Sequence, residues 1–145
     1  MTHIELIIEH LDLACLESIR EFAKNILRQY TRLDILIHNA GMMATSYMET
    51  HDGFELQMGV NHLGPVLLTE LLLPLLYNGT SSRIIVIASN LYQQAYNQSK
   101  LANVMYVREL AKHLDGLKVI PMSVHPGAVR TEISYTGDHR YQVSE

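Results

Sequence analysis

The chain has 145 residues, enough for one domain with a single sizeable hydrophobic core. A hydrophobic fraction of 48% and a charged fraction of 18% are typical of globular proteins and exclude a disordered chain. The net charge of -4 gives no electrostatic reason to expect a nucleic-acid partner. We therefore expect one globular domain over residues 1–145.

The sequence shows neither a disulfide framework nor an export signal. Cys15 is the single cysteine, and the first ten residues lack the basic start of a signal peptide. The most apolar run, residues 63–77, is shorter than the about 20 residues of a membrane span, and Glu70 and two prolines interrupt it. We expect a buried helix there, no membrane segment in this chain, and a cytoplasmic location.

The first half of the chain alternates predicted strands and helices. Residues 4–13 have the β-branched, apolar content of a strand, and residues 16–30 carry an apolar stripe at helical spacing. Residues 33–38 form a short apolar run that ends at the tight turn Asn39-Ala40-Gly41, which predicts a buried strand.

The same alternation continues to the end of the pattern. A long apolar helix is predicted over residues 53–77, a strand over 83–89, a helix up to about residue 113, and a strand over 118–125. This order predicts an α/β fold, a Rossmann-like doubly wound parallel sheet in three layers, with helices on both faces. Asn39, Ser89 and Pro126-Gly127 then fall at the carboxyl ends of strands, where such sheets bind ligands.

Within the segment AYNQSK, Tyr96 precedes Lys100 by four residues, so the two side chains share one helical face. An adjacent ammonium favours phenolate and lowers the pKa of a tyrosine, which suits proton transfer near neutral pH. The alternative is an ordinary helical aromatic followed by a solvated lysine. Tyr92 lies eight residues from Lys100, too far along a helix to share its charge.

Six motifs in a fixed order resemble the short-chain dehydrogenase/reductase family, and within it the retinol dehydrogenase-like branch. They are LDLA (11–14), HNAG (38–41), VNHLG (60–64), the serine that ends RIIVIAS (83–89), AYNQSK (95–100) and HPGAVRTE (125–132). The resemblance implies a nicotinamide cofactor, NADP or NAD, and the interconversion of an alcohol and a carbonyl. It also implies a small-molecule substrate, which the branch suggests is lipophilic, such as a retinoid or a steroid.

The resemblance assigns four catalytic residues. Tyr96 is the general acid or base, and Lys100 lowers its pKa and binds the nicotinamide ribose. Ser89 orients the substrate oxygen, although a serine at a strand end also caps the following turn. Asn61 offers its main-chain carbonyl to a water in the proton path, because Pro65 has no N–H to bond that carbonyl.

The resemblance also assigns the residues that contact the cofactor: Asp12, Asn39, Ala40, Gly41, Tyr96, Lys100, Pro126, Gly127 and Thr131. Two of these assignments have equally simple alternatives. Asp12 also suits the N-terminus of the following helix, where a carboxylate is favourable. An Asn-x-Gly turn closes many buried strands, although its small residues allow a dinucleotide to approach the backbone.

Several family features are absent or changed. The chain has no glycine-rich pyrophosphate turn, starts at the family's third strand and ends before the last ones, and six residues separate Ser89 from Tyr96. His38 stands where relatives usually carry asparagine. We expect a partial sequence or a shortened isoform that lacks the N-terminal βαβ opening, leaves residues 33–38 as an exposed apolar edge, and binds dinucleotide weakly alone.

Two other functions stay open. A catalytically impaired isoform could act as a binding partner or homodimerise through the helices at 53–77 and 91–113. Sugar-nucleotide epimerases also use Y-x-x-x-K, but HPGAVRTE argues against that chemistry.

Overall fold

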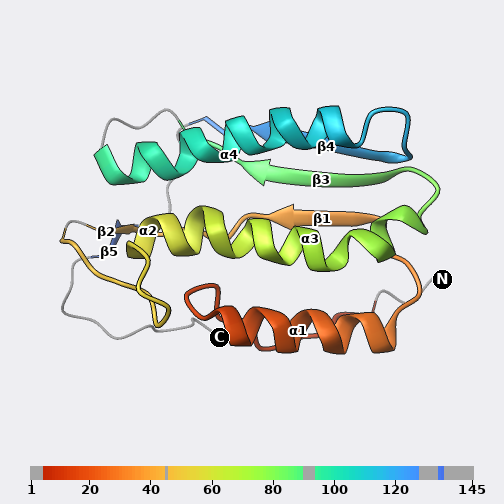
Figure 1. The fold of residues 1–145 in the computed structure, drawn as a ribbon, viewed down its shortest axis with the longest axis horizontal. Helices are drawn as coiled ribbons and strands as arrows, with labels where there is room; N and C mark the ends of the chain where they lie inside the picture. Colours follow the sequence, from red (N-terminus) through yellow and green to blue (C-terminus); the bar gives the residue numbers. More distant parts are fainter. Residues whose placement is uncertain (1–4, 45, 90–93, 128–133, 136–145) are drawn as a thin grey trace.

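The computed structural model describes residues 5–44, 46–89, 94–127 and 134–135 (Figure 1). The elements in chain order are α1 (Leu16–Gln29), β1 (Ile35–His38), β2 (Met43–Ala44), α2 (Leu56–Met58), the π-helix η1 (Gly59–Leu63), α3 (Gly64–Tyr77), β3 (Ser82–Ile87), α4 (Gln94–His113), β4 (Val119–Val124) and β5 (Ser134–Tyr135).

The main sheet has the order β1-β3-β4, and all its strands are parallel. Its register pairs His38 with Val86 and Ile87 with Val124, so the three strands end at one common edge. The predicted α/β class and the Rossmann-like parallel sheet are confirmed. A second, two-stranded parallel sheet joins β2 to β5, and the sequence did not predict it.

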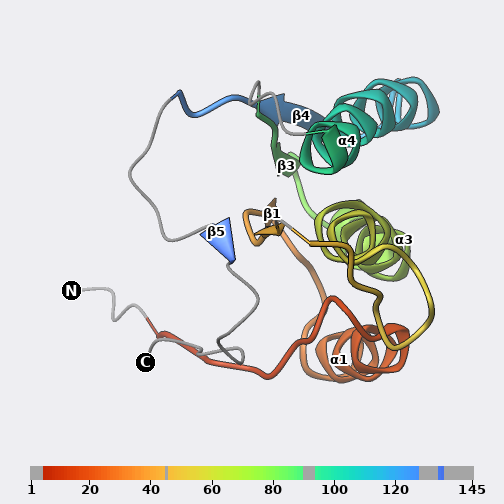
Figure 2. The ribbon, with the colours of Figure 1, turned by 90° about the vertical axis from the view of Figure 1, so that its left-hand side faces the viewer.

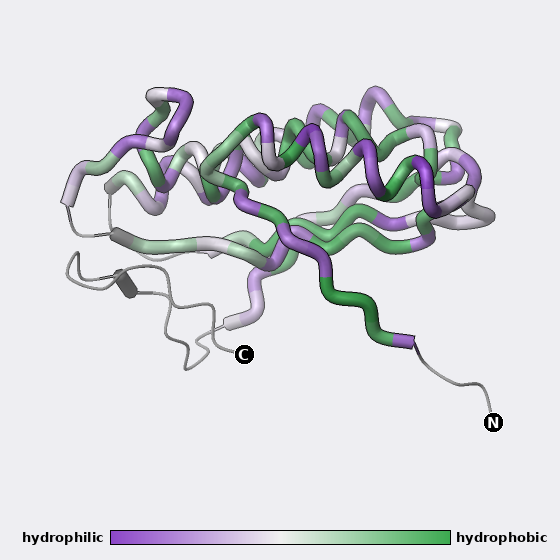
Figure 3. The backbone as a smooth tube through the Cα atoms, turned by 90° about the horizontal axis from the view of Figure 1, so that it is seen from below, coloured by the Kyte–Doolittle hydropathy of each residue, from purple (hydrophilic) through white to green (hydrophobic). Residues whose placement is uncertain are grey.

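The strand predicted at the start of the chain is wrong over its described part. Residues 5–10 have no strand pairing and are exposed, with Leu6 at 84% and Ile8 at 89%. In Figure 3 this segment extends away from the strands and helices toward the N-terminus. β-branched residues form a strand only where a neighbouring strand takes up their backbone hydrogen bonds, and no described strand lies beside this segment.

The helices α1, α3 and α4 lie on one face of the main sheet (Figure 2). Side chains on that face, such as Ile84 and Val86 of β3, are buried against Leu76 of α3 and against α4. The second helical layer of the predicted arrangement is not among the described residues. β1 is an edge strand of the described main sheet, and its Ile35 and Ile37 are about half exposed on the other face, as predicted for an exposed apolar edge.

The most apolar helix is part of the core. Its buried residues, among them Leu68, Leu72 and Leu75, pack against Ile19 and Ala23 of α1. By length and composition alone, the stretch Leu56–Tyr77 passes as a membrane span. It contains an 18-residue window with a mean hydropathy of 1.3, but half of that window is buried inside the protein. Its packing is that of a core helix, as predicted.

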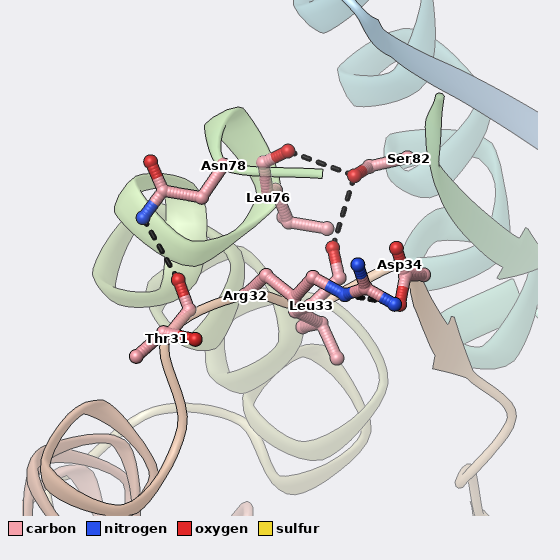
Figure 4. Close-up of polar contacts among 7 residues, drawn as sticks. All are labelled: Thr31, Arg32, Leu33, Asp34, Leu76, Asn78 and Ser82. Carbon is pink, nitrogen blue, oxygen red and sulfur yellow. Dashed lines mark hydrogen bonds and ion pairs between the residues drawn. The ribbon is translucent and has the colours of Figure 1, made fainter. Parts of the chain in front are cut away.

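At the amino ends of the strands, Ser82 ties three elements together (Figure 4). Its hydroxyl, which is fully buried, lies 2.9 Å from the carbonyl oxygen of Leu33 and 2.8 Å from that of Leu76. Gly79 is required beside it, because a Cβ at that position would collide with Ser82 Oγ. Asn78 adds a bond from Nδ2 to the carbonyl of Thr31 at 2.8 Å.

We expect Ser82→Ala to lower the free energy of unfolding by about 1 kcal/mol, because it removes the hydroxyl that the Leu33 and Leu76 carbonyls share, while the Leu76 carbonyl keeps the N–H of Gly79. Urea denaturation followed by circular dichroism measures this loss. Ser81→Ala is the matched control, since Ser81 is exposed and its loss should change stability by no more than about 0.5 kcal/mol. Equal effects of the two substitutions would contradict the assignment.

Candidate active site

The carboxyl ends of the three parallel strands carry the predicted site segments. Asn39, Ala40 and Gly41 follow β1, Ser89 lies two residues after β3, and Pro126-Gly127 lies two residues after β4. In Figure 1 the arrowheads of β1 and β3 point toward the side where α2 and the first turns of α4 lie. The chain therefore collects polar and small residues at one edge of the sheet, as expected for a ligand site in this fold.

Tyr96 and Lys100 lie on the buried side of α4. Their side chains are 4% and 3% exposed, and Lys100 Nζ lies 5.6 Å from the centre of the Tyr96 ring. The ammonium also donates to the carbonyl oxygen of Ile87, the last residue of β3, at 3.0 Å. Burial lowers the pKa of Lys100 from its ordinary value. The pair is thus fixed at the end of β3, and the solvated-lysine alternative is excluded.

The helix before the site changes its geometry where the sequence predicts a kink. Gly59–Leu63 is a π-helix, in which the N–H of Gly64 bonds the carbonyl of Gly59 instead of that of Val60. Pro65 follows directly and cannot donate to the carbonyl of Asn61. π-helical turns inside α-helices are frequent at functional sites, and this one turns the Asn61 side chain toward α4.

The carboxamide of Asn61 joins three parts of the site and is 1% exposed. Its Oδ1 accepts the backbone N–H of Met42 at 2.8 Å, and its Nδ2 donates to the carbonyl of Met42 at 2.9 Å. The same Nδ2 lies 3.0 Å from the hydroxyl oxygen of Ser99, which donates to the carbonyl of Tyr96 at 2.8 Å. Asn61 therefore links the segment after β1 to the turn of α4 that carries Tyr96.

Gly41 lies where this network meets the lysine. A Cβ at Gly41 would come within 3.2 Å of Asn61 Oδ1 and 3.3 Å of Lys100 Nζ, tighter than most contacts of this kind. The absence of a side chain keeps the backbone at this position close to the two polar groups. The structure thus brings together four predicted residues: Gly41, Asn61, Tyr96 and Lys100.

The carbonyl oxygen of Asn61 has one partner that the sequence did not predict, because Nδ2 of Asn103 donates to it at 3.0 Å. Pro65 does remove the helical donor, as predicted. The replacement comes from a side chain 42 residues later, on a helix whose packing against η1 the sequence pattern does not show.

Asp12 and Gly127 make hydrogen bonds with residues outside this cluster. Asp12 Oδ1 accepts the N–H of Ala14 at 2.8 Å in the turn before α1. Gly127 has a φ of 81° and its N–H donates to His125 Nδ1 at 2.8 Å. Thr131 and Tyr92 lie outside the described residues.

Two residues of the site were missed in the sequence: Ser99 and Asn103, both buried. They stand three and seven residues after Tyr96, and therefore on the same helical face as Tyr96 and Lys100. This spacing is present in the sequence. It places two polar residues on the helix face of Tyr96 and Lys100, which could have indicated that they belong to the site.

A family profile described as short chain dehydrogenase matches residues 2–141. Retinol dehydrogenase 14 of Homo sapiens is 48% identical over 147 residues, which cover 89% of this chain and 44% of the human protein. Retinol dehydrogenase 13 of Homo sapiens is 45% identical over 150 residues, covering 90% of this chain and 45% of that protein. The chain thus spans less than half the length of these curated relatives.

Among solved structures, an alcohol dehydrogenase from the archaeon Thermococcus sibiricus, complexed with 5-hydroxy-NADP, is similar with a TM-score of 0.71. It is 27% identical, and the match covers 85% of this chain and 55% of that one.

Proposed function

This chain belongs to the short-chain dehydrogenase family, and on that premise we propose that it serves NAD(P)-dependent interconversion of an alcohol and a carbonyl. The observation that carries the proposal is the buried pair of Tyr96 and Lys100 at the end of β3. This pair places a cationic side chain beside the phenol that would exchange a proton with the substrate.

Bound NAD(P) would supply the hydride, while the protein supplies position, electrostatics and the proton. The residues present fit such a cofactor, since Gly41 has no side chain to block a ligand and lies next to Lys100 Nζ. Lys100 uses one of its three N–H donors on the carbonyl of Ile87. Another of its donors would hold a ribose hydroxyl. The other cofactor contacts would come from Asn39, Ala40, Pro126, Gly127 and Thr131. Asp12 would contact the cofactor on its adenine side.

In the reduction direction, Tyr96 donates its phenolic proton to the carbonyl oxygen of the substrate, and in the oxidation direction it removes the hydroxyl proton. Ser89 donates a hydrogen bond that holds the substrate oxygen beside Tyr96. Asn61 keeps the backbone of Gly41 and Met42 in place through its carboxamide. Each of these roles is part of the proposal.

We propose a lipophilic substrate, such as a retinoid or a steroid. The support is the identity of 48% and 45% to two proteins named retinol dehydrogenase.

The test is reduction of all-trans-retinal by the purified chain, with NADPH and NADH compared at millimolar concentration. Consumption of cofactor together with formation of retinol supports the proposal. If the chain is folded, as judged by circular dichroism, and forms no retinol with either cofactor, the proposal is contradicted.

A second candidate function is association with another copy or with a relative. It is favoured by the outer face of α4, where Leu101 and Met105 are each 60% exposed and Val104 is 41% exposed. Exposed apolar side chains gathered on one helix face are typical of an interface. Size-exclusion chromatography with light scattering distinguishes a dimer from a monomer, and Met105→Lys should shift a dimer that uses this face toward monomer.

A further inference from the structure

Asn103 is a buried amide, 3% exposed, in the middle of α4. Its Nδ2 donates to the carbonyl oxygen of Asn61 at 3.0 Å, and its Oδ1 lies 2.9 Å from Nδ1 of His62. An amide oxygen only accepts, so His62 carries its proton on Nδ1. Both polar groups of Asn103 are therefore used on two consecutive residues of the π-helix.

The carbonyl that Asn103 bonds is one that the helix leaves without its usual donor. In an α-helix the N–H of residue 65 would bond the carbonyl of residue 61, and Pro65 has no N–H. A buried carbonyl without a partner costs about 1–3 kcal/mol. The Asn103 amide replaces the lost bond and stabilises the π-helical turn in the form that the structure shows.

The same residue, Asn61, holds the segment after β1 through its side chain. Its carboxamide bonds both backbone groups of Met42 and reaches Ser99, which in turn bonds the carbonyl of Tyr96. A shift of the Asn61 backbone would therefore move the carboxamide and release Met42. Gly41, which lies beside Lys100 Nζ, would move with it.

We propose that Asn103 is a positioning residue. Its amide fixes Asn61 at the π-helical turn, and through Asn61 it fixes the Gly41-Met42 backbone against Lys100. The carboxamide of Asn61 bonds Met42, and its carbonyl accepts the Asn103 amide. The consequence for turnover rests on the proposed function, whereas the consequence for the Met42 backbone does not.

Asn103→Asp tests this directly, because it keeps the shape of the side chain and replaces the donor with a second acceptor. The readout is amide hydrogen exchange by nuclear magnetic resonance at Met42, whose N–H bonds Asn61, compared with Val86 in the central strand β3. We expect exchange at Met42 to become about tenfold faster, with a smaller change at Val86. A merely structural role would destabilise the whole core and would speed Val86 by the same factor or more, which would overturn the proposal.

Two further variants complete the experiment. Gln98→Glu makes the same charge change on the exposed side of α4 and should leave exchange at Met42 unchanged. Asn103→Leu removes the donor without adding a charge, and it replaces Asn103→Asp if the buried carboxylate prevents folding. Unchanged exchange at Met42 in a folded Asn103 variant contradicts the proposal.

The same variants separate this inference from the proposed function. Where the wild-type chain reduces retinal, loss of the Asn103 donor should lower kcat about tenfold and change KM for the carbonyl little, because alignment and not substrate contact is lost. An unchanged kcat would refute the catalytic consequence. Where the wild-type chain does not turn over, the proposed function fails, and exchange at Met42 alone decides the role of Asn103.

Discussion

Substitution of Tyr96 by phenylalanine is expected to lower carbonyl reduction by roughly 10²–10⁴-fold, the range that a positioned proton donor contributes. The change removes one oxygen atom from a side chain that is 4% exposed and keeps the aromatic ring beside Lys100 Nζ. The fold should therefore stay intact, while the proton source for the carbonyl oxygen is lost. Initial rates of NADPH oxidation with retinal, at saturating cofactor, measure the effect.

Tyr106→Phe is the matched control on the same helix. Its hydroxyl lies 3.4 Å from Glu70 Oε1, away from the Tyr96 and Lys100 pair, so its loss should leave the rate within about twofold. A Tyr96→Phe chain that retains the wild-type rate would show that another group supplies the proton.

The stability of the chain is expected to fall in mild acid because of His38. This residue ends β1, is 7% exposed, and lies with Nε2 2.7 Å from Thr69 Oγ1. The Thr69 hydroxyl donates its proton to the carbonyl of Pro65 at 2.9 Å, so His38 Nε2 is the donor to Thr69. Burial lowers the pKa of His38 from 6.5 to about 4.

The sign of the effect follows from proton uptake. Between pH 6.5 and about 4 the unfolded chain binds a proton on His38 that the folded chain does not. The stability that neutral His38 contributes is therefore fully present above pH 6.5 and is lost as the pH falls toward about 4. Between pH 7 and pH 5 this one group should remove about 2 kcal/mol from the free energy of unfolding. Urea denaturation at the two pH values measures the difference.

His38→Asn is the comparison for that experiment, since asparagine does not titrate in this range. The pH dependence of the variant should be flatter than that of the wild type by about 2 kcal/mol. Identical pH dependence in the two proteins would show that folding does not lower the pKa of His38.

Three of the four predicted strands and all the predicted long helices could be identified from the sequence because each is defined by its own periodicity. The helix predicted to end near residue 113 does end at His113, before Gly116 with its φ of 77°. Residues 4–13 have a similar composition, but strand formation also depends on a neighbour in space, which composition does not show. The pairing of β2 with β5 joins residues about 90 positions apart and has no local pattern.

For the candidate site, the spacing of Tyr96 and Lys100 and the kink at Pro65 were predictable because both are local. Their burial at the end of β3 depends on the docking of α4 against the sheet. The bond from Asn103 to the Asn61 carbonyl depends on the docking of α4 against η1, which no local pattern in the sequence indicates. Hydrogen bonds between distant elements are the part of this site that periodicity does not determine.

The most direct measurement of the central claim is a crystal structure of the chain with NADPH. We expect the nicotinamide ring to lie at the carboxyl ends of β1 and β3, next to the Tyr96 hydroxyl, with Lys100 Nζ bonded to a ribose hydroxyl. A nicotinamide bound elsewhere on the chain, with Tyr96 and Lys100 in no contact with it, would refute the proposed role of this pair.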